Sequence, residues 1–171
     1  MHIDNCSHSF AELAATILPS YMGKLHIAIQ QPWSTSIFSQ PGQGVTRVAK
    51  TLGRTADFSG CYVLLDKGKP IYVGISRRVI VRLRQHLMGK DHFAASLAYS
   101  MAKKHHGSKL GTRKTAMLDY AFGDHFHLAQ AYLRSLSVAT VEIDNPLELY
   151  VFEAYAAMEL ETAEWNTFRT H

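Results

Sequence analysis

The apolar and polar positions near the start of the chain change from a regular to an irregular pattern. In residues 10–21 the apolar side chains recur three or four positions apart, which predicts a helix. Its cap and apolar positions are Ser9, Phe10, Leu13 and Ile17. Residues 30–59 are rich in Ser, Gln, Gly, Pro and Thr and favour an irregular connector or arm. We therefore predict an N-terminal helix and arm over residues 1–57 and an ordered domain over residues 58–171.

The first regular elements of the ordered domain form a predicted β-hairpin. Residues 60–65 and 70–74 are rich in apolar, β-branched and aromatic side chains, as strands are. The three residues 66–68 between them fit a type I turn followed by a left-handed residue, and the last of the three is a glycine. This loop length places Tyr62 directly opposite Tyr72 on one face of the sheet.

Helices and one more strand are predicted over the rest of the chain. The helix of residues 78–88 has an apolar stripe made of Val79, Leu83 and Leu87. Further helices are predicted at residues 93–104, within residues 126–136 and at residues 146–161, and a third strand at residues 138–143. The last helix begins with a cap, a proline and a glutamate, which are Asn145, Pro146 and Glu148. The predicted fold class is α/β (α+β), with a small, mainly antiparallel three-stranded sheet flanked by helices.

Composition and charge narrow the class of protein without fixing its activity. With 171 residues, 47% of them hydrophobic, the chain can build a core. No apolar run approaches the roughly 20 residues of a membrane-spanning helix, and the first residues lack a signal peptide, so we expect a cytoplasmic protein without a membrane partner. Cys6 and Cys61 lie far apart, which argues against a disulfide framework or a zinc knuckle. The net charge of +4 is compatible with a polyanionic partner.

Two short motifs in the hairpin resemble those of a known nuclease family. Gly60-Cys61-Tyr62 stands ten residues before Tyr72-Val73-Gly74, and the pair resembles the GIY and YIG motifs of the GIY-YIG endonucleases. Other family positions follow in the family's order and are filled by Arg82, His86, Glu153 and Asn166. The resemblance runs from residue 60 to about residue 166, with an apparent helical, basic insertion at about residues 89–135. It implies a DNA endonuclease, a phosphodiester hydrolase that depends on a divalent metal ion.

The resemblance gives Glu153 the position of the metal ligand. The residue lies one turn from Leu149 and beside Phe152, at or near the apolar stripe of its helix. A carboxylate there is costly unless it is paired or binds a cation, and Mg²⁺ or Mn²⁺ suits one carboxylate together with water and phosphate oxygens. The alternative is a glutamate at the edge of the stripe that reaches solvent.

Four further residues are candidates for the catalytic chemistry. Arg82 and His86 are four positions apart and share a helix face, from which Arg82 could stabilise charge on a phosphate. With the resemblance, Tyr62 is assigned to activating the attacking water, with His86 as its proton partner, and Tyr72 to positioning water or phosphate. Which of Tyr62 and His86 is the ultimate base stays open. The alternatives are a solvated arginine and tyrosines that only pack in the sheet. The family's positions also make Gly74 and Asn166 supporting residues.

Basic residues of the helix and of the insertion are candidates for DNA binding. Contacts with the phosphate backbone would make that binding depend on salt. The candidates are Arg78, Arg84, Lys103, Lys104, Lys109, Arg113 and Lys114. The basic part of the insertion is also compatible with a solvated loop between helices. The histidines match no standard zinc spacing, so no zinc site is predicted among His92, His105, His106, His125 and His127.

The leading hypothesis is a metal-dependent endonuclease that acts on DNA. The position after the second motif is Ile75, where repair members of the family commonly carry a lysine, and this difference favours a restriction-like or stand-alone enzyme. The alternatives are a toxin or effector nuclease with the same site and a catalytically inactive DNA-binding module. The sequence leaves open the specificity, the number of strands cut, and whether the protein is a monomer or a homodimer.

Overall fold

The computed structural model describes residues 3–107 and 111–168, and the chain folds into two compact units. The first unit consists of Met1–Ser34, Asp57–Val79 and Ser137–His171. The second unit consists of Thr35–Ala56 and Ile80–Leu136. The stretch predicted as an N-terminal helix and arm, residues 1–57, contributes to both units.

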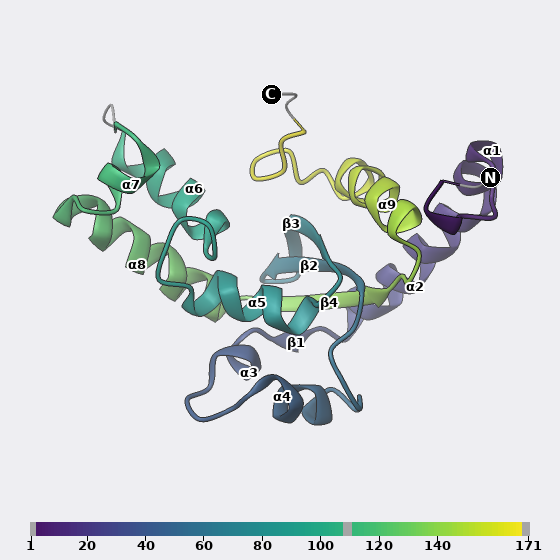
Figure 1. Cartoon of the computed structure of the whole chain (residues 1–171), viewed down its shortest axis with the longest axis horizontal. Helices are drawn as coiled ribbons and strands as arrows, with labels where there is room; N and C mark the ends of the chain where they lie inside the picture. The colour runs from purple at the N-terminus through teal and green to yellow at the C-terminus, as the bar shows by residue number, and fades with distance from the viewer. Residues whose placement is uncertain (1–2, 108–110, 169–171) are drawn as a thin grey trace. The chain divides into compact units, whose positions relative to one another are not determined.

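The first unit contains an antiparallel sheet with the strand order β1-β4-β2-β3 (Figure 1). The strands are β1 (Trp33–Ser34), β2 (Gly60–Asp66), β3 (Lys69–Ser76) and β4 (Ser137–Glu142). The predicted fold class is confirmed, although the sheet has four strands instead of three. The additional strand, β1, lies in the stretch whose composition predicts an irregular connector. Its residue Trp33 pairs with Val138, and a pairing over such a sequence distance leaves no local pattern.

The predicted register of the β2–β3 hairpin is wrong. Tyr62 lies opposite Gly74 instead of Tyr72. The connecting loop has two residues, Lys67 and Gly68, whose φ angles of 51° and 82° fit a type I′ turn. A β-bulge further along the hairpin then shifts the pairing by one more residue. The shorter loop and the bulge together move the opposite partner of Tyr62 by two positions, which keeps both tyrosines on the same face.

Helical segments from both ends of the chain belong to the first unit. The N-terminal segment comprises a 3-10 turn (Ile3–Asn5), α1 (Phe10–Glu12), a π-helical turn (Leu13–Ile17) and α2 (Leu18–Gln30). It extends well beyond the predicted end at residue 21. Ser9 caps α1 in a capping box with Glu12. The C-terminal helix is α9 (Pro146–Glu159), which the side chain of Asn145 caps as the sequence predicts.

One face of the sheet forms the core of the first unit with α2 and α9. Helix α2 packs on β4, and α9 packs on β2 and β3. Buried members of this core from the sheet and the helices include Cys61, Val63, Val73, Val141, Leu25, Leu149 and Phe152. Side chains alternate between the two faces along a strand, so Tyr62 and Tyr72 stand on the opposite face from α9.

The second unit is built from helices. Its elements are α3 (Ser36–Ser39), α4 (Val45–Thr51), α5 (Val79–Met88, of which Val79 belongs to the first unit), α6 (Ser96–His106), α7 (Arg113–Ala116) and α8 (Tyr120–Ser135). The prediction of an irregular stretch over residues 30–59 is therefore wrong for α3 and α4. Helices α6 and α8 pack side by side in the predicted insertion (Figure 1). The predicted stripe of α5, made of Val79, Leu83 and Leu87, is fully buried. Within the described residues, no helix has the length and apolarity needed to cross a membrane.

Candidate active site

The two motif tyrosines are diagonal neighbours on one face of the sheet. The ring centroids of Tyr62 and Tyr72 lie 6.3 Å apart, with the ring planes tilted by 49°. Tyr62 is only 1% exposed, whereas Tyr72 is half-buried. Of the two phenols, Tyr72 therefore has the greater access to water.

The two motif glycines are required by close approach of their neighbours. Tyr62 lies across the strand from Gly74, and a Cβ atom added to Gly74 would overlap the phenol ring. A Cβ atom added to Gly60 would overlap the carbonyl oxygen of Val141 on β4. Gly74 thus makes the space that the Tyr62 ring occupies, which gives this supporting residue a defined task.

Glu153 projects from the middle of α9 in surroundings that do not stabilise its charge. The side chain is half-buried, next to the buried Phe152 in sequence and about one turn from the buried Ala156. Burial raises the pKa of its carboxyl group above the ordinary value. No hydrogen bond or ion pair reaches this carboxylate from the part of the chain that the structure describes. Burial and, to a smaller extent, the charge of Glu153 raise the pKa of the Cys61 thiol, which identifies Cys61 as a neighbour on β2.

Asn166 fastens the C-terminal segment to the edge of the sheet. Its Oδ1 accepts a hydrogen bond from the backbone N–H of Val73 at 2.9 Å, and its Nδ2 donates to the carbonyl oxygen of Val73 at 2.7 Å. The side-chain amide thus pairs with β3 much as a neighbouring strand would. Because β3 is the last strand of the sheet, this contact marks the edge next to the YIG-like motif.

Arg82 is held in place by neighbours within the second unit. Its Nη1 donates to the carbonyl oxygen of Ala94 at 3.0 Å and to Oε1 of Gln85 at 3.3 Å, and its Nη2 donates to Oγ of Ser96 at 2.8 Å. These bonds orient the plane of the guanidinium group and leave some of its five N–H donors for another acceptor. The side chain is half-buried, so the sequence-based alternative of a fully solvated arginine does not describe it.

His86 is fully buried in the second unit, one turn from Arg82. Burial, assisted by the positive charge of Arg82, lowers the pKa of its imidazole from 6.5 to about 3. The ordinary pKa of histidine, which suggests His86 as a base near neutral pH, is therefore not the pKa of this residue. At neutral pH the imidazole is uncharged and retains an accepted proton poorly.

The predicted DNA-binding residues divide into exposed and engaged side chains. Lys103, Lys104, Arg113 and Lys114 are exposed at the end of α6 and in α7. Lys109 lies outside the described residues. Arg78 is exposed and lies 3.9 Å from Asp57, while Nη1 of Arg84 donates to the carbonyl oxygen of Phe38 at 2.8 Å. The exposed side chains of α6 and α7 are accessible to a polyanion, whereas Arg84 makes a structural contact.

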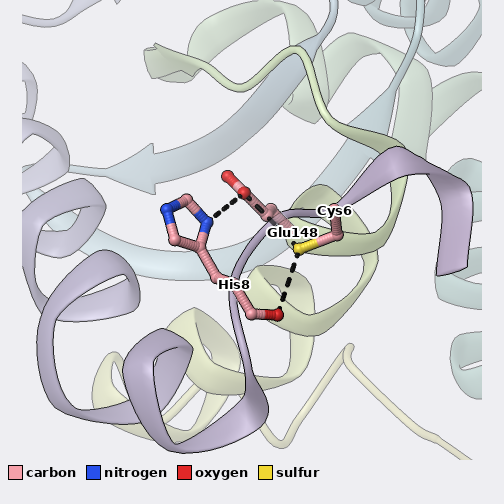
Figure 2. A group of neighbouring side chains, drawn as sticks. All are labelled: Cys6, His8 and Glu148. Atoms are coloured by element: carbon pink, nitrogen blue, oxygen red, sulfur yellow. Dashed lines mark hydrogen bonds and ion pairs between the residues drawn. The ribbon is translucent and has the colours of Figure 1, made fainter. Parts of the chain in front are cut away.

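A group of metal-ligand side chains that the sequence does not predict lies elsewhere in the first unit. Cys6, His8 and Glu148 place one ligand atom each within 4.8 Å of the others (Figure 2). None of these residues belongs to the histidines considered for zinc from the sequence. The Cys-x-His spacing of Cys6 and His8 is the one local sequence signal for this group. The third side chain, Glu148, is 140 positions away from His8 in the sequence.

The structure brings the motif tyrosines together in the first unit and places Arg82 and His86 in the second. No curated protein and no solved structure matches the chain. Residues 58–170 match the model of one family, described as the GIY-YIG catalytic domain. The match begins where the sequence predicts the ordered domain to begin. The family resemblance is thereby confirmed, and this chain, with its nuclease-type fold, belongs to the GIY-YIG catalytic domain family.

Proposed function

We propose that the protein is a divalent-metal-dependent endonuclease that hydrolyses DNA phosphodiester bonds. The observation that carries this proposal is the carboxylate of Glu153, which is half-buried and receives no hydrogen bond or ion pair from the described residues. It lies in a domain that belongs to a nuclease family, at the position that the motif resemblance assigns to the metal ligand. A carboxylate kept in this state destabilises the fold, so its presence is best explained by a ligand.

The residues present fit a hard divalent cation. A single carboxylate suits Mg²⁺ or Mn²⁺, because these ions prefer oxygen ligands and take their remaining ligands from water and phosphate oxygens. Burial raises the pKa of Glu153, so binding a cation would also relieve the cost of its negative charge. When bound, such an ion would neutralise the charge that develops on the scissile phosphate.

The two tyrosines are proposed to handle the attacking water. The half-buried Tyr72 has the phenol that water can reach, and the buried Tyr62 is its diagonal neighbour on the same face. Tyr72 would therefore orient the water or a phosphate oxygen, and Tyr62 would assist in its activation. The tyrosines and α9 lie on opposite faces of the sheet, so a substrate shared by the tyrosines and Glu153 would have to reach both faces past the edge strand β3.

Arg82 and His86 are proposed to serve the same reaction from α5. The guanidinium group of Arg82, already oriented by Ala94 and Ser96, would donate its remaining N–H groups to a phosphate oxygen. Such preorganised donors stabilise transition-state charge without a further ordering cost. His86 is proposed to contribute a neutral hydrogen-bonding imidazole, because its pKa of about 3 makes it a weak base.

The proposal is tested by nicking of supercoiled plasmid DNA. We expect cleavage with Mg²⁺ or Mn²⁺, none with EDTA, and recovery when Mg²⁺ is restored in excess. Glu153→Gln should reduce cleavage at least 100-fold, as should Arg82→Ala, whereas Glu159→Gln is the matched control because Glu159 is exposed on the same helix. Cleavage by Glu153→Gln at the wild-type rate would show that Glu153 is not the metal ligand. DNA binding without any cleavage by the wild type would identify a binding module instead.

A matched set of tyrosine variants tests the role of the hairpin. Tyr72→Phe and Tyr62→Phe should each lose most of the cleavage activity because the phenol oxygen is removed. Tyr120→Phe serves as the control, since Tyr120 is 85% exposed at the start of α8. Equal activity of all three variants would leave Tyr62 and Tyr72 as packing residues.

A further inference from the structure

The N-terminal segment meets the first turn of α9 in a cluster of three metal-ligand side chains. Figure 2 shows Cys6, His8 and Glu148 pointing toward one another. Nδ1 of His8 lies 2.9 Å from Oε1 of Glu148, and Sγ of Cys6 lies 3.7 Å from the same oxygen. Cys6 and Glu148 are buried, whereas the side chain of His8 is 35% exposed. The thiol and the carboxylate of the cluster are therefore shielded from solvent, and the imidazole is accessible to it.

The chain holds Cys6 and His8 between two fixed points. Before them, Asp4 and Asn5 adopt left-handed φ angles of 49° and 57°, and the carbonyl oxygen of Asp4 accepts a hydrogen bond from Nδ2 of Asn145. After them, Ser9 caps α1 with its capping box. The turn in between thus presents both side chains to the start of α9.

Glu148 is directed into the cluster instead of to its own helix cap. A glutamate at the third position of a helix often accepts a hydrogen bond from the backbone N–H of the cap residue, but the carboxylate of Glu148 bonds to His8 and Tyr21 instead. The hydroxyl of Tyr21 donates to Oε2 of Glu148 at 2.6 Å. This bond fixes the carboxylate so that its other oxygen, Oε1, faces His8 and Cys6.

We propose that Cys6, His8 and Glu148 form a binding site for a zinc-class transition-metal ion, separate from the site of Glu153. Thiolate and imidazole ligands favour Zn²⁺ over Mg²⁺, which prefers oxygen alone. Glu148 and Glu153 are five positions apart and thus point about 140° from each other around α9. The two carboxylates consequently cannot share one ion through the same face of the helix.

The spacing of the ligand atoms is close to what a tetrahedral zinc ion requires. Bonds of about 2.0–2.3 Å place the ligand atoms roughly 3.3–3.8 Å apart. The distance of 3.7 Å between Sγ and Oε1 falls within this range. The distance of 2.9 Å between Nδ1 and Oε1 has to increase by a few tenths of an ångström. On binding, the thiol of Cys6 releases its proton to solvent, His8 binds through neutral Nδ1, and water takes the fourth position on the open side. The bond from Tyr21 then orients the carboxylate ligand.

Metal binding to the full-length protein tests this proposal. After removal of bound metal with a chelator, the protein is titrated with Co²⁺ and followed in the near ultraviolet, where a thiolate bound to cobalt absorbs. We expect one Co²⁺ per chain with a thiolate band, displaced by Zn²⁺. The band should disappear in Cys6→Ser and persist in Cys61→Ala, because Cys61 is fully buried in the sheet core. His8→Asn should weaken binding at least tenfold, and its partly exposed position makes it a variant that folds.

The outcomes distinguish a metal site from a hydrogen-bonded cluster. No thiolate band in the wild type, or an unchanged band in Cys6→Ser, would overturn the proposal and leave the three side chains as a hydrogen-bonded anchor. If Cys6→Ser fails to fold, equal Co²⁺ affinity of His8→Asn and the wild type overturns it as well. Glu153→Gln should bind Co²⁺ with its thiolate band intact, so this result is independent of whether the protein cleaves DNA.

Discussion

The two glutamates of α9 stand in contrasting surroundings although they belong to one helix. Glu148, in the first turn, has little exposed surface, and burial alone would raise its pKa, yet hydrogen bonds from Tyr21 and His8 bring the pKa below the ordinary value. Glu153, in the middle of the helix, is half-buried, and burial raises its pKa without an opposing hydrogen bond from the described residues. The supply of hydrogen-bond donors therefore decides which of the two carboxylates is stabilised in its ionised form.

The largest expected difference between the two glutamates is in catalysis. Glu153→Gln should lose at least 100-fold in DNA cleavage, whereas Glu148→Gln should retain Mg²⁺-dependent cleavage at a temperature where it is folded. The reason is that, of these two glutamates, Glu153 is the one whose carboxylate has no partner among the described residues. Initial rates of plasmid nicking for both variants, measured in parallel, check this. Equal losses in the two variants would break the comparison.

The next difference is in stability, where the Glu148 substitution should be the more damaging of the two. Glu148→Gln should lower the free energy of unfolding by about 1–3 kcal/mol, because it weakens a buried set of charge-assisted hydrogen bonds. Glu153→Gln should leave stability unchanged or raise it, since it removes a half-buried charge that no donor among the described residues stabilises. Urea unfolding at neutral pH with a chelator present measures both values. A Glu153→Gln protein less stable than Glu148→Gln would contradict the assignment.

The pH dependence of stability sharpens the same contrast. Glu148 has a lowered native pKa, so the stability it provides is present above the unfolded value near 4.5 and is lost as the pH falls through the native value. Glu153 has a raised native pKa, so its ionised form opposes folding and acidification toward pH 4.5 removes that penalty. For each variant, the difference in unfolding free energy from the wild type is measured from pH 7 to pH 3. This difference should change with pH in opposite directions for Glu148→Gln and Glu153→Gln. Parallel curves would show that neither residue titrates as described.

The smallest expected effect concerns the donor that distinguishes Glu148. Tyr21→Phe should cost about 0.5–1.5 kcal/mol of stability, because it removes the 2.6 Å bond to Oε2. It should also move the pKa of Glu148 upward, which a carbon-13 NMR titration of the carboxyl group measures. Tyr155→Phe is the control, since Tyr155 packs on Phe152 and its hydroxyl makes no hydrogen bond in the described residues. If both variants behave alike, the donor is not what separates the two glutamates.

Elements with a strong local pattern could be predicted from the sequence. The buried stripe of α5, the cap of α9 and the alternating strand β4 follow from residue spacing, and the structure contains all three. The hairpin register could not be predicted, because Lys67 adopts a left-handed conformation that is not expected for a lysine. The bulge beside the hairpin depends on how the two strands pair. Strand β1 likewise exists only through its pairing with β4.

The properties of the candidate site can be separated in the same way into those that the sequence determines and those that the tertiary structure decides. The sequence by itself determined the family motifs and thus the identities of Tyr62, Tyr72, Arg82 and Glu153, because these depend on residue type and order. Only the tertiary structure decided the electrostatic state of each group, since a pKa depends on burial and neighbouring donors. It lowered the pKa of His86, left Glu153 without a donor among the described residues, and brought Cys6 and His8 to Glu148. Contacts between segments more than a hundred residues apart, as in this last group, arise only when the chain folds, so no local pattern could show them.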